Sequence, residues 1–230
     1  MVSGLPTRLS EVRERIAQAA RKAGRAPQEV LLMAVTKGFS RDTVADALAC
    51  GISLFGENRV QEAQLKYAGL QGQWELHLIG HLQRNKAKSA SGIVACVQSI
   101  DSIETARALN RCCGERERSI DVLFELNTSG EESKGGVRGG EDLLRLLDQW
   151  GTLSWLKPRG LMTVGPLSED RARVRRSFAE LRAVFEEIRI SRGLDRFDVL
   201  SMGMSGDYEI AIEEGATMVR LGTAVFGPRG

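Results

Sequence analysis

The chain has 230 residues, of which 42% are hydrophobic and 27% charged, a balance typical of a folded globular protein rather than a disordered one. Its formal net charge of +2 is too small to indicate a nucleic acid or a membrane surface as a partner. The four cysteines include no CxxC pair, which predicts reduced structural thiols in a reducing compartment and no zinc site: Cys50, Cys96, Cys112 and Cys113.

Residues 1–25 predict a helix rather than a targeting segment. Apolar residues recur at helical spacing from Leu5 to Ala19, interspersed with basic residues. A signal peptide needs a continuous apolar stretch, which is absent here, and no run is long enough to span a bilayer. We therefore expect a helix over residues 6–24 at the start of a cytoplasmic protein.

Short β-rich runs then alternate with longer helical patterns along the rest of the chain. Clear helical segments are expected at 41–49, 59–68, 103–112, 141–150 and 172–190. The eight candidate strands are 30–36, 53–55, 75–79, 93–97, 121–126, 159–162, 197–200 and 218–221.

Strict alternation of strand and helix indicates parallel pairing, because a helix must carry the chain back between neighbouring parallel strands. Eight such units are the number that closes a (β/α)8 barrel of the TIM type. The sequence therefore predicts an α/β fold, with one barrel domain over residues 1–230 and an extra N-terminal helix. An open doubly wound sheet is the alternative, since periodicity alone does not distinguish the two.

Polar and glycine residues follow the predicted strands, where barrels carry their functional groups. After the last two strands, Ser201 and Thr223 offer hydroxyl donors, while Gly203 and Gly222 let the backbone approach an anion closely. Barrels often bind a phosphate at this place. Ordinary turn chemistry is the alternative explanation for these residues.

Lys37 directly follows the first predicted strand and can point into the mouth of the barrel. Partial burial there would favour the neutral amine, which can condense with an aldehyde. A surface lysine at a strand end is the alternative interpretation.

Three competing motifs carry less weight. The segment 130–135 mimics part of a phosphate-binding loop, but Gly136 and Val137 stand where lysine and a hydroxyl residue are needed. His77 and His81 flank a strand end rather than sharing a helix face, so a shared metal ion is not expected. A serine–histidine–acid triad has no GxSxG motif to support it.

Seven ordered motifs resemble the pyridoxal phosphate homeostasis proteins, a family with the fold of the N-terminal domain of alanine racemase. The resemblance covers nearly the whole chain. The motifs are AVTK (34–37), FGENRVQE (55–62), HLIGHLQRNK (77–86), SKG (133–135), RGLM (159–162), LSMGMSGD (200–207) and VRLGTAVFG (219–227).

This resemblance implies that pyridoxal 5'-phosphate is held as a Schiff base on Lys37, with Arg220 facing the pyridine nitrogen and Asn58 near the ring. It also implies that Ser201, Gly222 and Thr223 hold the phosphate, whereas Lys134 has no settled role. The sequence departs from the family pattern just after Lys37, where Phe39 and Ser40 replace a frequent lysine and proline.

The leading hypothesis from the resemblance is a monomeric carrier that sequesters the cofactor and delivers it to apo-enzymes, without robust turnover. A permanently charged Arg220 cannot accept the pyridine proton, so the ring is a weak electron sink. An amino-acid racemase is the runner-up, but it needs a second acid/base group, and neither Tyr67 nor Tyr208 lies at a predicted strand end. A sugar-phosphate-binding barrel is a third interpretation that leaves Lys37 unused.

Overall fold

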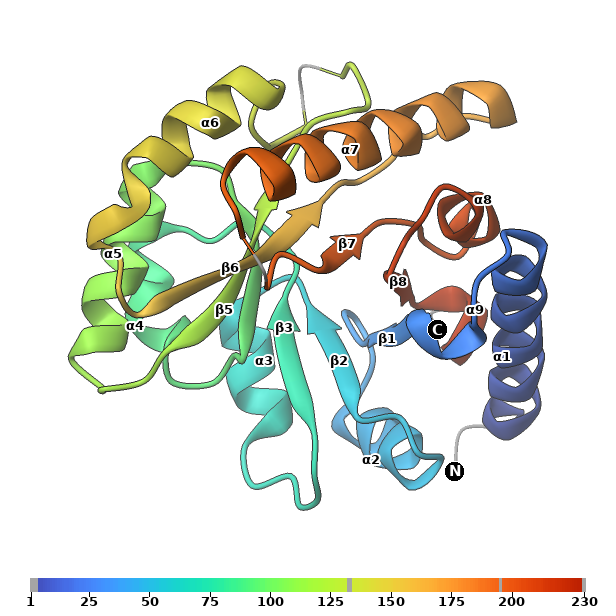
Figure 1. Cartoon of the computed structure of the whole chain (residues 1–230). Coiled ribbons are helices and arrows are strands. Elements are labelled where there is room, and N and C mark those ends of the chain that lie inside the picture. Colours follow the sequence, from blue (N-terminus) through green and yellow to red (C-terminus); the bar gives the residue numbers. More distant parts are fainter. Residues whose placement is uncertain (1–3, 132–133, 195, 229–230) are drawn as a thin grey trace.

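The computed structural model describes residues 4–131, 134–194 and 196–228, and its strands form a closed parallel barrel (Figure 1). The strands follow one another around the barrel in sequence order, and β8 pairs with β1 to close it. This confirms the predicted barrel and rules out the open sheet. The strands are β1 (Leu31–Val35), β2 (Leu54–Glu57), β3 (Glu75–Leu78), β4 (Cys96–Ile100), β5 (Ile120–Glu125), β6 (Leu156–Met162), β7 (Val199–Ser201) and β8 (Met218–Leu221).

Helices surround the barrel (Figure 1), and the predicted ones all form, with ends within two residues of those expected. Three short 3-10 turns lie in the connections between helices and strands: η1 (Pro27–Glu29), η2 (Arg84–Lys86) and η3 (Trp150–Thr152). The helices are α1 (Leu5–Lys22), α2 (Arg41–Ala49), α3 (Val60–Tyr67), α4 (Ala87–Ala90), α5 (Ile103–Gly114), α6 (Gly140–Asp148), α7 (Arg171–Ser191), α8 (Tyr208–Glu213) and α9 (Thr223–Phe226).

The main hydrophobic core lies between the barrel and its helices, because alternate strand residues point outward. On β5, Val122 and Phe124 join this core. Leu123 points the other way and packs with Cys96 and Met162 in a second, smaller apolar cluster. The same inner side also carries buried polar groups, among them Gln98, Ser201 and Arg220, which makes it the place to look for a functional site.

The predicted fourth strand, 93–97, is wrong in its boundaries, since β4 spans Cys96–Ile100. Val94 is hydrogen-bonded back to Ala90 and completes the turn after α4 instead of starting the strand. Gln98 and Ser99 consequently lie inside the strand, fully buried. Their polarity made them look like the residues that follow a strand.

Helix α1 fastens the end of the chain to the barrel. Its apolar stripe is buried, and Figure 1 shows it beside α8 and α9. Arg8 donates through Nε to Val225 O at 2.9 Å and through Nη2 to Phe226 O at 3.1 Å. These are the carbonyl groups at the end of α9, so α1 holds the helix that follows β8.

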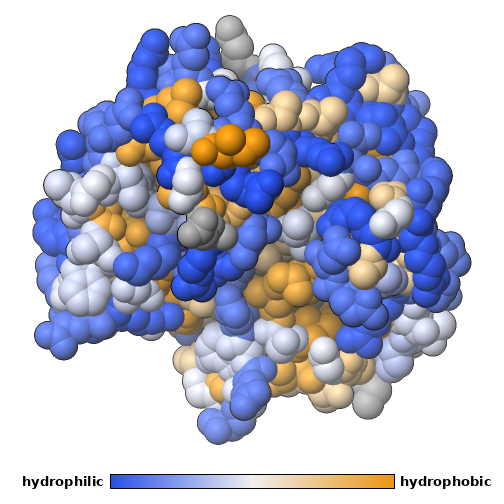
Figure 2. Space-filling view, in the orientation of Figure 1, coloured by the Kyte–Doolittle hydropathy of each residue, from blue (hydrophilic) through white to orange (hydrophobic). Residues whose placement is uncertain are grey.

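Figure 2 shows a face on which hydrophilic residues predominate and hydrophobic ones appear in small groups. Within the described part of the chain, no helix is both long and apolar enough to cross a membrane. Large apolar side chains are exposed at scattered positions: Leu31, Leu65, Leu167, Ile190 and Met204.

Candidate functional site

The predicted site residues come from four neighbouring strands. The barrel order places β7, β8, β1 and β2 side by side in parallel, so their carboxyl ends open onto the same rim. At this rim Lys37 is the second residue after β1, and Asn58 directly follows β2. Ser201 ends β7 with Gly203 just beyond it, Arg220 lies within β8, and Gly222 and Thr223 come directly after β8.

Arg220 is buried, with 3% of its surface exposed. It donates through Nη1 to Ser201 Oγ at 2.8 Å and through Nη2 to the Thr163 carbonyl at 2.7 Å. Burial lowers the pKa of the guanidinium to about 10, against the opposing influence of Asp207 and Glu125. Arg220 therefore stays charged at neutral pH, as the sequence predicted.

The Ser201 hydroxyl belongs to a chain of buried polar groups that runs along the barrel interior. Ser201 Oγ donates to Gln98 Oε1 at 2.7 Å, and Gln98 Nε2 lies 2.8 Å from His77 Nδ1. His77 Nε2 in turn lies 2.7 Å from Glu75 Oε1. The structure thus turns the Ser201 hydroxyl toward Gln98 and Arg220, and its predicted role toward a phosphate stays a prediction.

The turns after β7 and β8 meet through a residue that the sequence analysis did not select. Ser205 Oγ accepts a hydrogen bond from Ala224 N at 3.2 Å and so joins the β7–α8 turn to the start of α9. Gly203 has φ 92°, and a Cβ there would lie 2.6 Å from Ala211 Cβ. Gly222 is half-buried and Thr223 exposed, so both remain accessible beside this junction.

Lys37 is half-buried in the turn that leads from β1 to α2. The residue before it, Thr36, is completely buried, and its hydroxyl lies 2.8 Å from the hydroxyl of Tyr67. Burial raises the pKa of Tyr67 above its usual range. Tyr67 was not expected near the strand ends, but it reaches the β1 end from the last residue of α3.

Asn58 lies at the edge of a polar cavity of about 630 Å³ between the segments that follow β2 and β3. The half-buried Asn58 and the exposed Arg59 line the side formed by the segment after β2, and His81 lines the side formed by the segment after β3. This cavity adjoins the Lys37 turn, because Glu62, another of its lining residues, accepts a hydrogen bond from Gly38 N at 3.0 Å.

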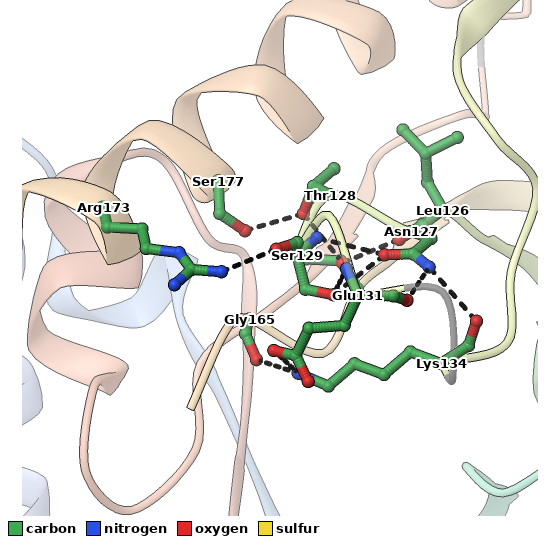
Figure 3. A network of polar contacts seen from close by, with 10 residues as sticks. Leu126, Asn127, Thr128, Ser129, Glu131, Lys134, Gly165, Arg173 and Ser177 are labelled. Carbon is green, nitrogen blue, oxygen red and sulfur yellow. Dashed lines mark hydrogen bonds and ion pairs between the residues drawn. The ribbon is translucent and has the colours of Figure 1, made fainter. Parts of the chain in front are cut away.

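Lys134 is held in the loop after β5, as Figure 3 shows. Its ammonium donates to Glu131 Oε1 at 2.9 Å and to the Gly165 carbonyl at 3.0 Å, bridging the loops after β5 and β6. Asn127 Nδ2 donates to the Glu131 and Lys134 carbonyls. Ser133, in the same sequence motif, lies outside the described residues.

The two histidines are engaged in separate contacts. His77 is buried between Gln98 and Glu75, whereas His81 Nδ1 lies 3.4 Å from Asp101 Oδ2. Among residues 4–131, 134–194 and 196–228, no group of three or more histidine, cysteine or acidic side chains is arranged to hold a metal ion.

Two buried polar residues, Gln98 and Lys66, were not predicted from the sequence. Gln98 is 103 positions from Ser201, so only barrel closure brings the two together. Lys66 had a local signal, because it stands four residues after Glu62 on a helix and forms an ion pair with it.

The model of the alanine racemase N-terminal domain matches residues 7–230. Among curated proteins, the pyridoxal phosphate homeostasis protein of Aquifex aeolicus is 40% identical over 223 residues, covering 96% of this chain and 97% of that protein. The protein of the same name from Escherichia coli K12 is 35% identical, covering 96% and 95%.

Solved structures agree with these matches. PipY of Synechococcus elongatus, in a structure with pyridoxal phosphate bound, is 34% identical with a TM-score of 0.85, covering 97% of this chain and all of that one. An unknown protein from Bifidobacterium adolescentis is 36% identical with a TM-score of 0.90, covering 98% and 95%. An alanine racemase of Clostridium difficile, 14% identical, shares the fold, with a TM-score of 0.74 over 99% of this chain and 56% of its own.

Proposed function

The chain belongs to the pyridoxal phosphate homeostasis proteins of the alanine racemase N-terminal domain family, and on that premise we propose that it binds pyridoxal 5'-phosphate as a Schiff base on Lys37. The bound cofactor would supply a reactive aldehyde that condenses reversibly with amines. The role is to keep this aldehyde sequestered and available inside the cell, and the recipients are apo-enzymes that need it.

The observation that carries the proposal is Arg220, a buried cation one strand away from the strand that leads to Lys37. Among the described residues, its hydrogen bonds go to neutral oxygens, those of Ser201 and Thr163, and it forms no ion pair with a carboxylate. A buried charge of this kind suits a ligand that offers a lone pair, such as an unprotonated ring nitrogen.

The remaining rim residues fit the other parts of the same ligand. Gly222 and Thr223 stand at the accessible start of α9, where backbone N–H groups and a hydroxyl can donate to a phosphate. Ser201 would act through Arg220, and Gly203 lets the β7–α8 turn pack closely. Asn58 would lie beside the ring.

A carrier suits this site better than a racemase. Racemisation needs an acid/base group on each face of the substrate, and Lys37 can supply one. The two tyrosines of this chain, Tyr67 and Tyr208, are both buried at 2% exposure. Tyr67 is hydrogen-bonded to Thr36, and Tyr208 lies beneath the Arg15 guanidinium. We therefore expect negligible formation of D-alanine from L-alanine by the loaded protein.

The test is spectroscopic. The purified protein with pyridoxal 5'-phosphate should show a visible imine band that borohydride abolishes, with the reduced adduct mapped to Lys37. Lys37→Ala should lose the covalent band and keep weak phosphate-dependent binding. A full imine spectrum in Lys37→Ala, or an adduct on another lysine, would contradict the assignment. Pyridoxal without its phosphate should bind at least about tenfold more weakly, because hydrogen bonds to a charged group are lost.

A further inference from the structure

A buried polar cluster lies beneath the turn that carries Lys37. It comprises Thr36 directly after β1, Glu57 at the end of β2, and three residues of α3: Glu62, Lys66 and Tyr67. The side chains of Lys66 and Glu57 are 6% and 0% exposed, whereas Glu62 is one-third exposed. None of these residues is among those proposed above to contact the cofactor.

Lys66 uses all three N–H donors of its ammonium inside the cluster. It donates to Glu57 Oε1 at 2.6 Å, to Glu62 Oε1 at 2.9 Å and to the Thr36 carbonyl at 2.6 Å. Burial raises the pKa of the Glu57 carboxyl, and the hydrogen bond from Lys66 opposes that shift. A buried ion pair adds little net stability compared with apolar packing, so this group calls for a role beyond holding the fold together.

The contacts converge on the two peptide groups that flank Lys37. Lys66 binds the Thr36 carbonyl, which belongs to the peptide before Lys37. Glu62 Oε1 accepts from Gly38 N at 3.0 Å, which belongs to the peptide after it. Because peptide groups are planar, holding both of them fixes the two backbone dihedral angles of Lys37. Gly38 has φ 73°, so glycine suits the turn that brings its N–H toward Glu62.

The Thr36 side chain connects the backbone next to Lys37 to β2 and to α3. Its hydroxyl donates to Glu57 Oε1 at 2.6 Å and lies 2.8 Å from the Tyr67 hydroxyl. The backbone around Lys37 is thus attached to β2 through Glu57 and to α3 through Lys66 and Tyr67. The direction of the Lys37 Cα–Cβ bond follows from these attachments.

We propose that Lys66, together with Glu57 and Glu62, is the positioning residue for Lys37, fixing the backbone from which its amine reaches the cofactor aldehyde. The inference rests on the proposed function, because it takes Lys37 to be the Schiff-base lysine. A lysine side chain loses rotamer entropy when its amine is fixed in an imine, and a fixed backbone avoids the further entropic cost of ordering the turn.

The experiment compares Lys66→Met and Glu62→Ala with the wild type and with Leu109→Ala. Leu109 is fully buried on α5, so Leu109→Ala lowers stability without touching the Lys37 turn. Each protein is assayed well below its unfolding midpoint for three quantities: the rate of imine formation from added pyridoxal 5'-phosphate, the pH titration of the visible band, and the visible circular dichroism per unit of absorbance.

Lys66→Met should slow imine formation about tenfold or more, the size expected when a hydrogen bond to a charged group is lost, and should shift the pH titration and weaken the visible dichroism. Glu62→Ala, at a partly exposed position, should fold and show the same changes to a smaller degree, and Lys66→Arg should restore part of the loss. Leu109→Ala should keep the wild-type values.

Wild-type rates, titration and dichroism in both Lys66→Met and Glu62→Ala would overturn the positioning role while leaving the Schiff base on Lys37 intact. If Lys66→Met does not fold, the values for Glu62→Ala decide alone. The proposed function would fail separately, through a wild-type protein that forms no reducible imine on Lys37.

Discussion

At the scale of single residues, the barrel interior contains a buried charged side chain, that of Arg220. Arg220 is hydrogen-bonded to two neutral acceptors, Ser201 Oγ and the Thr163 carbonyl, and Ser201 in turn donates to Gln98. A hydroxyl that donates to Gln98 presents its lone pairs to the guanidinium, so Gln98 decides which way this hydroxyl points. The geometry of the arginine at the rim therefore depends on an amide deep in β4.

This dependence predicts the effect of Gln98→Leu. The substitution removes the acceptor of the Ser201 O–H and the partner of His77 Nδ1, and each such loss in a buried position costs about 1–3 kcal/mol of unfolding free energy. Affinity for pyridoxal 5'-phosphate should fall as well, because Ser201 can then turn away from Arg220. Urea unfolding measures the first effect and equilibrium binding the second.

Ser99→Ala is the matched control, since it removes a neighbouring buried hydroxyl that donates to the Gly80 carbonyl at 2.7 Å. It should lower stability and leave Arg220 undisturbed. Equal losses of cofactor affinity in Gln98→Leu and Ser99→Ala would show that Gln98 acts on the fold alone.

At the scale of elements, the longer helices could be predicted from the sequence because their apolar residues recur at helical spacing. The bounds of the fourth strand could not, since its inner side carries polar residues that find partners only in the closed barrel. Lys37 could be selected because it follows a strand end, where barrels carry their functional groups, whereas Arg220 was selected through the family resemblance. The contacts of Gln98 with Ser201 and of Lys66 with Glu57 could not be predicted, because in each pair the two residues come from different elements that meet only in the folded barrel.

Helix α1 is an element whose effect reaches the predicted phosphate end of the site. Arg8 binds the last carbonyl groups of α9, a helix of four residues that is too short to be stable without contacts to the rest of the protein. Arg8→Ala should therefore speed hydrogen exchange of the α9 amides and weaken binding of pyridoxal 5'-phosphate, by about tenfold if both charged hydrogen bonds matter.

Arg15→Ala on the same helix provides the comparison. Arg15 pairs with Glu209 at 2.6 Å on an exposed surface, where such pairs contribute about 0–1 kcal/mol. If the α9 amides exchange hydrogen at the wild-type rate in Arg8→Ala, or equally fast in Arg8→Ala and Arg15→Ala, then the Arg8 contacts of α1 do not support this end of the site.

At the scale of the whole molecule, the rate at which buried thiols are labelled can measure how often the closed barrel opens, because a buried thiol must become exposed before it reacts. Cys96 lies inside β4 and Cys113 at the base of α5, both buried, whereas Cys50 is half-buried. Burial raises the pKa of the Cys113 thiol to about 11 and that of Cys96 well above its usual range. At about pH 8, about one Cys113 thiol in a thousand is then the reactive thiolate, so labelling in the native state should be slow.

The barrel should expose Cys96 and Cys113 together, because β8 closes against β1 and no strand edge is left to open alone. A cofactor that binds the folded state stabilises it by mass action, by about 2.7 kcal/mol at about 100 times its Kd. Labelling of these two thiols should accordingly slow about a hundredfold in the wild type on cofactor addition, and far less in Lys37→Ala. Mass spectrometry with a thiol reagent gives each rate, and Cys50, whose access does not need barrel opening, serves as the internal control. Protection of Cys96 without Cys113, or of Cys113 without Cys96, would indicate that the barrel opens in parts and that the cofactor stabilises only one of these parts.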